Sequence, residues 1–154
     1  MNKSYLYFAF LTFSFAAFLS ACSDDGGDSI ADRCKNGPSK ACLVGEWRFD
    51  GIEGDDNTKC EGNLSIQENN KYIFEGGCGG PDYKIKASGN WNLDGKNIEI
   101  NCIVDCAEDS SGGGTIDINS DGKSMSIESK TSRAAVSFYK TERVSRPKEK
   151  FTRK

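Results

Sequence analysis

The chain has 154 residues, with 20 basic and 23 acidic side chains, no histidine and a formal net charge of −3. This slightly acidic balance argues against a nucleic-acid partner, which would call for a basic surface. The lack of histidine removes the usual general base and a common zinc ligand. We therefore expect a binding protein without a cofactor rather than an enzyme.

The first 21 residues have the anatomy of a secretion signal. Lys3 makes a short positive region, residues 5–19 are apolar, and Ser20 and Ala21 place two small residues before Cys22. A transmembrane helix is the alternative, but it would need about 20 apolar residues, more than this stretch provides. The pattern resembles a bacterial lipoprotein signal with its lipobox. That resemblance implies cleavage before Cys22, a diacylglycerol on its thiol and, often, an acyl group on the new amino group.

Two or more acyl chains hold a protein firmly, so the resemblance implies a domain tethered by lipid to a membrane of the bacterial cell envelope. In a Gram-negative cell this would be the outer membrane. Asp24 and Asp25 loosely resemble a surface-export signal, which leaves both the surface and the periplasmic leaflet open. Residues 22–42 are expected to form a flexible acidic tether and lead-in segment, because residues 23–33 lack apolar periodicity.

Removing the signal deletes only Lys3 from the charge count, so 19 basic and 23 acidic residues leave a net charge of −4 on 133 residues. That length fits one domain with a modest core. We expect this domain over residues 43–144. The Lys/Arg-rich residues 145–154 are expected to form a solvated C-terminal tail.

Six cysteines remain besides Cys22, and an even number in an exported chain indicates three disulfides. Six cysteines allow about 15 connectivities, among which sequence alone cannot choose. We favour the local set: Cys34 with Cys42, Cys60 with Cys78, and Cys102 with Cys106. Zinc is the alternative, but histidine is absent and only the last pair has the short spacing of zinc ligands.

From residue 43 onward, apolar and polar residues alternate between turn residues, which is typical of half-buried antiparallel strands. We predict strands over residues 45–52, 62–67, 71–75, 83–93, 97–104, 115–119, 124–129 and 134–143. Asn69-Asn70, Asp94-Gly95 and Asp121-Gly122 lie where tight hairpins need residues that tolerate positive φ.

One face of these strands collects apolar side chains and must be hidden. The inward set is Trp47, Phe49, Leu64, Ile66, Tyr72, Phe74, Tyr83, Ile85, Trp91, Ile98, Ile100, Ile116, Ile118, Met125, Ile127, Val136 and Phe138. A meander with one apolar face hides that face and its two edges by closing. The predicted fold is therefore all-β: a small, eight-stranded, up-and-down antiparallel barrel stapled by disulfides.

Residues 117–128 match the calcium-loop pattern D-x-[DN]-x-[DN]-G-x5-E position for position. An EF-hand needs a helix on each side of this loop. Here a Ser/Gly stretch precedes it, and Ile116, Ile118, Met125 and Ile127 alternate as they would in a hairpin. We interpret the segment as a β-hairpin and predict no metal site.

Gly45-Glu46-Trp47 on the first expected strand matches the G-x-W signature of lipocalins. Arg143 ends the last expected strand, where that family places a basic residue against the tryptophan. Residues 71–74, 89–93 and 137–140 also look like lipocalin-like lipoproteins of bacterial envelopes. The chain resembles this family over about residues 43–143, which implies a barrel closed between its first and last strands, with Trp47 covered by Arg143. The alternative is that Trp47 is a core aromatic of another small β-fold.

Two functions remain open. The resemblance implies a lipid-anchored envelope protein that holds a small apolar ligand inside the barrel. The alternative is an envelope interaction module, an inhibitor or scaffold whose loops bind a protein or glycan while the interior is filled. Seven inward aromatic residues would leave little room for a ligand: Trp47, Phe49, Tyr72, Phe74, Tyr83, Trp91 and Phe138.

Overall fold

The computed structural model describes residues 29–80, 84–104, 111–131, 133–137, 139 and 145–154. In this part of the chain, two short helices, α1 (Ile30–Cys34) and α2 (Lys40–Leu43), precede eight strands. The strands are β1 (Gly45–Ile52), β2 (Cys60–Ile66), β3 (Lys71–Cys78), β4 (Ile85–Asp94), β5 (Asn97–Val104), β6 (Ser111–Ile118), β7 (Ser124–Ser129) and β8 (Lys148–Arg153).

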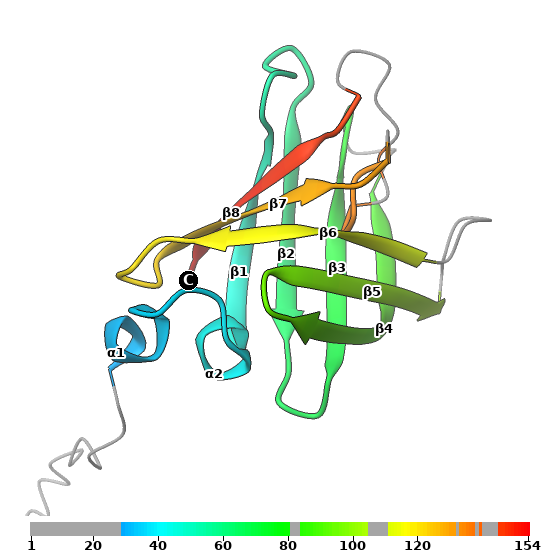
Figure 1. The fold of residues 1–154 in the computed structure, drawn as a ribbon. Helices are drawn as coiled ribbons and strands as arrows, with labels where there is room; N and C mark the ends of the chain where they lie inside the picture. The colour runs from blue at the N-terminus through cyan, green and yellow to red at the C-terminus, as the bar shows by residue number, and fades with distance from the viewer. Residues whose placement is uncertain (1–28, 81–83, 105–110, 132, 138, 140–144) are drawn as a thin grey trace, which may run out of the picture.

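Each strand pairs antiparallel with its neighbour in sequence, and β8 pairs back onto β1, so the sheet is a closed barrel. Figure 1 shows β8, in red, lying between β1 and β7. The predicted all-β, eight-stranded, up-and-down barrel is confirmed. Closure leaves no sheet edge open to other chains.

The predicted bounds of β1, β5 and β7 agree with the structure, but the predicted eighth strand is wrong. Residues 134–137 form no strand, and the closing strand is β8, inside the segment predicted to be a solvated tail. The pattern was hidden because the inward side chains of β8 are Glu149, Phe151 and Arg153, of which only one is apolar. A search for apolar alternation passes over such a strand.

The lead-in segment was predicted to be flexible, but residues 30–34 and 40–43 are helical. Ser29 and Ser39 cap these helices, each accepting a hydrogen bond from a backbone N–H three residues later. Helices of five and four residues are unstable alone, but here a disulfide joins them and the side chain of Leu43 is buried. Among the described residues, no helix is long and apolar enough to cross a membrane.

The three predicted tight turns are present. Asn70, Gly95 and Gly122 have φ values of 63°, 58° and 70°, in the left-handed region that glycine and asparagine tolerate. In the β6–β7 turn, the Asp121 carboxylate accepts a hydrogen bond from the backbone N–H of Lys123 at 2.9 Å. Such side-chain bonds hold the turn and set the register of the strands on both sides.

The predicted inward face largely forms the core. The buried members are Trp47, Phe49, Leu64, Ile66, Tyr72, Phe74, Trp91, Ile98, Ile100, Ile116, Ile118, Met125, Ile127 and Val136. Ile85 is partly buried, and Tyr83 and Phe138 lie outside the described residues. Phe151 of β8 completes the set, with its ring centroid 5.3 Å from that of Phe49.

Candidate functional site

One end of the barrel is closed around Trp47. The indole is fully buried, and its Nε1 donates a hydrogen bond to the carbonyl of Leu43 at 2.9 Å. The guanidinium carbon of Arg153 lies 4.1 Å from the centroid of the Trp47 ring. A cation over an indole face contributes about 0.5 to 2 kcal/mol, depending on how far both groups are desolvated.

The guanidinium of Arg153 also ties β8 to two segments that are distant in sequence, residues 42–44 and the β6–β7 turn. Its Nε donates to the Gly122 carbonyl at 2.8 Å, its Nη1 donates to the Val44 carbonyl at 3.0 Å, and its Nη2 donates to the carbonyl of Cys42. A side chain at Gly45 would collide with Nη1 of Arg153. Gly45 also has a φ of 142°, which other residues rarely adopt, so glycine suits both the backbone here and the position of this arginine.

The sequence interpretation assigned this place to Arg143, which lies outside the described residues. The structure puts Arg153 there, ten positions further along the chain. Burial is the main cause that lowers the pKa of Arg153, and the nearby charge of Arg33 adds to it. A guanidinium nevertheless remains charged at physiological pH.

Two of the favoured disulfide pairs are present. Cys34 and Cys42 join α1 to α2, and Cys60 and Cys78 face each other across β2 and β3. Cys102 is also disulfide-bonded. Cys106 and the lipidation candidate Cys22 lie outside the described residues.

The register of β1 and β8 pairs Trp47 with Arg153 and Ile52 with Glu149, so Glu149 lies toward the other end of the barrel. There, residues 133–137, which we call the plug, enter the core. The side chains of Ala134, Ala135 and Val136 are at most 1 % exposed. The plug therefore fills space that would otherwise lead into the barrel.

Glu149 holds the plug in place. Its carboxylate is fully buried and accepts hydrogen bonds from the backbone N–H of Val136 at 2.8 Å and of Ser137 at 2.7 Å. Burial raises the pKa of Glu149, and the hydrogen bonds from the plug offset part of that rise. Gly112 of β6 makes room, since a side chain there would collide with the backbone of Ala135.

The calcium-like segment is a hairpin, as predicted: β6 and β7 pair from Gly114 with Ser129 to Ile118 with Met125. A calcium ion would need side-chain oxygen atoms that here form hydrogen bonds within the hairpin. For example, Asn119 Oδ1 accepts a hydrogen bond from the backbone N–H of Ser124 at 2.8 Å. In the described part of the chain, no group of three or more Cys, Asp or Glu side chains is placed to hold a metal ion.

Sequence reasoning missed Glu149, Phe151 and Arg153 as inward residues. Their period-two spacing, with lysine and threonine between them, was the available signal. Together these features define the class of protein as a small, disulfide-bonded, closed antiparallel barrel that is covered at one end and plugged at the other. Comparison with known proteins found no matching family model, no similar curated protein and no similar solved structure.

Proposed function

We propose that this chain is a lipocalin-like envelope lipoprotein that acts as an interaction module and binds its partner from the outside of a filled barrel. The observation that carries the proposal is the plug, whose residues 134–136 are buried, held by Glu149 and packed against Gly112. Packed aromatic rings fill the interior further, with the ring centroids of Phe49 and Phe74 5.7 Å apart. A ligand would have to displace chain that is already well packed.

The proposed lipid on Cys22 would also orient the barrel. The described domain begins at Ser29, directly before α1 and beside the end covered by Arg153. Seven residues of chain span at most about 25 Å. The covered end would therefore face the membrane, and the plugged end and the sides of the barrel would be open to partners.

A small internal ligand is the second candidate, and Tyr72 favours it. Its hydroxyl is buried and has no hydrogen-bond partner among the described residues, and desolvation raises its pKa to about 12. An unpaired buried hydroxyl costs about 1 to 3 kcal/mol, which a polar group of a ligand could recover.

Titration with an apolar fluorescent probe such as anilinonaphthalene sulfonate distinguishes the two candidates. For a filled barrel we expect no saturable fluorescence increase up to about 0.1 mM probe. The matched variant is Tyr72→Phe, which removes only the hydroxyl and should leave the fluorescence unchanged. Saturable binding by the wild type that weakens in Tyr72→Phe would overturn the filled-barrel proposal in favour of the internal ligand.

Fractionation of cells tests the anchor. Cys22→Ser removes the thiol that would carry the lipid, so we expect the protein to leave the membrane fraction or to remain uncleaved. Ser23→Ala is the matched control and should stay with the membrane. Cleaved Cys22→Ser protein that still sediments with membranes would contradict lipid anchoring.

A further inference from the structure

The outer face of β4, β5 and β6 carries a regular grid of small polar residues. The strand register aligns Asn92, Glu99 and Gly113 in one row and Asn90, Asn101 and Ser111 in the next. These six residues, which we call the amide face, alternate along each strand with inward residues of the core. The three strands lie side by side in Figure 1.

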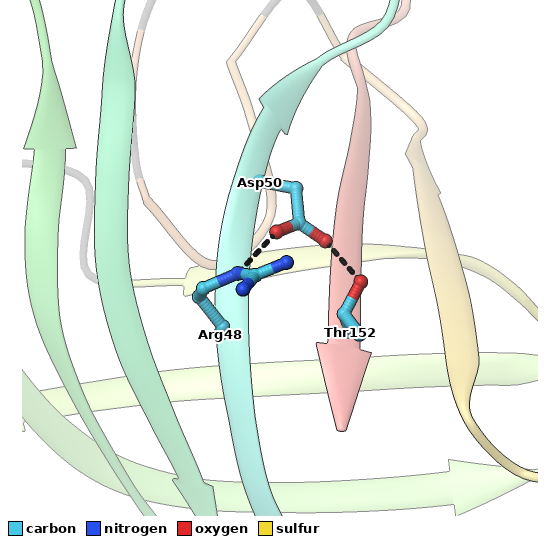
Figure 2. A network of polar contacts seen from close by, with 3 residues as sticks. All are labelled: Arg48, Asp50 and Thr152. Atoms are coloured by element: carbon cyan, nitrogen blue, oxygen red, sulfur yellow. Dashed lines mark hydrogen bonds and ion pairs between the residues drawn. The ribbon is translucent and has the colours of Figure 1, made fainter. Parts of the chain in front are cut away.

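The amide face differs from the opposite side of the barrel in how its polar groups are used. On the opposite side, the Asp50 carboxylate binds Arg48 at 2.7 Å and accepts a hydrogen bond from Thr152 at 2.5 Å (Figure 2). Closer to the amide face, ion pairs join Lys84, directly before β4, to Glu61 of β2, and Lys86 of β4 to Glu75 of β3. Such pairing occupies part of the hydrogen-bonding capacity of these side chains.

Within the described part of the chain, the side chains of Asn90, Asn92, Glu99 and Asn101 make no hydrogen bond or ion pair. Each asparagine amide offers two donors and an acceptor, and Glu99 offers acceptors only. The face therefore presents many unused hydrogen-bonding groups with little net charge.

The amide face is also hollowed. A shallow depression of about 670 Å³ lies over it, and Lys130 stands at its margin. The hollow lies where Gly113 occupies an outward position without a side chain. The Gly113 carbonyl accepts a hydrogen bond from the backbone N–H of Lys130 at 3.1 Å, which places Lys130 beside the hollow. Neighbouring strands lie about 4.8 Å apart, so the three strands together span about 10 Å across the depression.

We propose that the amide face binds a neutral glycan. Sugar hydroxyls both donate and accept, which matches paired donors and acceptors on neighbouring amides. Among the described residues that line the depression, Lys130 is the one cation, which is too few for a nucleic acid. The one aromatic residue among them, Trp91, is buried, whereas protein hot spots rely on accessible aromatic residues and arginine. Glycan binding rests on the proposed role as an interaction module. It gives that role a ligand class and a place on the side of the barrel.

The test is a titration of the full, 15N-labelled protein in detergent micelles, followed through the side-chain amide signals of asparagine by NMR. The probes are maltoheptaose and tetra-N-acetylchitotetraose. We expect one of them to shift the amide signals of Asn90, Asn92 and Asn101, with a Kd of about 1 mM or tighter. The signal of Asn63, which is exposed on β2 of the opposite side, should not move.

Variants make the test specific. Asn92→Ala combined with Asn101→Ala should weaken binding at least about tenfold, and the matched control Asn63→Ala should leave the Kd unchanged. Gly113→Thr should fill the depression and abolish binding, and threonine suits a strand. The added Cβ would lie 3.3 Å from the Ile98 carbonyl oxygen, a tight contact, so a cooperative thermal transition of the variant must show that the barrel is kept.

No shift with either probe up to about 10 mM would overturn the glycan proposal. Binding that persists unchanged in the double variant or in Gly113→Thr would overturn it as well. Either failure concerns the amide face alone, since the apolar-probe and fractionation experiments test the proposed function separately.

Discussion

Deleting residues 148–154 should abolish folding of the barrel. These residues include β8, which pairs with both β1 and β7 and supplies the buried side chains of Glu149 and Phe151. Without them, two strand edges and part of the core would be open to water. Circular dichroism should show no cooperative thermal transition for the truncated protein, and size-exclusion chromatography should show expanded or aggregated chains.

Replacing Lys148 and Lys150 with serine is the matched control for the deletion. It removes surface ion pairs to Glu53 but keeps the backbone of β8, so it should cost no more than about 1 kcal/mol. A truncated protein that melts cooperatively near the wild-type temperature would mean that residues 148–154 are a tail after all.

Within β8, Arg153→Ala should lower the free energy of unfolding by roughly 3 kcal/mol. The substitution leaves three carbonyl groups without their hydrogen-bond donor and uncovers Trp47. Arg146→Ala is the matched arginine control. Arg146 is exposed and lies outside the strands, so its loss should stay within about 0.5 kcal/mol. Equal effects of the two substitutions in urea unfolding would contradict the role of Arg153 in closing the barrel.

Glu149→Ala should destabilise the protein by about 3 to 5 kcal/mol, measured by urea unfolding. The substitution leaves the buried N–H groups of Val136 and Ser137 without their acceptor and opens a void beneath the plug. Glu149→Gln, which keeps the shape and one acceptor oxygen, should cost distinctly less. A cost below about 1 kcal/mol for Glu149→Ala would show that the plug does not depend on this carboxylate.

The wild type and Glu149→Gln should differ in how the free energy of unfolding depends on pH. Burial raises the folded-state pKa of Glu149 above its ordinary value of 4.5, so the folded chain binds more protons than the unfolded chain between those two values. The stability that Glu149 contributes is therefore fully present below pH 4.5 and is lost as pH rises through the folded-state pKa.

Glutamine at this position does not titrate. In urea unfolding, the stability of the wild type should thus fall relative to that of Glu149→Gln as the pH rises above 4.5 and through the folded-state pKa of Glu149. A wild type that gains stability relative to Glu149→Gln as the pH rises would contradict the direction of the pKa shift.

Local sequence determined much of this protein. Alternation located β1, β5 and β7 because inward side chains such as Trp47 and Ile127 are apolar and the side-chain period of a strand is two. Turn residues such as Asn70 and Gly95 could be predicted because few residues tolerate positive φ. The pairing of Cys60 with Cys78 was favoured only because it is local, among about 15 connectivities that the sequence left open, and the structure contains it.

Tertiary structure alone decided β8, the plug and the lead-in helices. Glu149 and Arg153 lie at inward positions that local patterns assign to apolar residues, and burying a charge is favourable only when partners surround it. Those partners come from distant segments: the plug for Glu149, and α2 together with the β6–β7 turn for Arg153. Their positions exist only after the barrel has closed, so the period-two spacing of residues 149–153 was too weak a local signal to distinguish a closing strand from a charged tail.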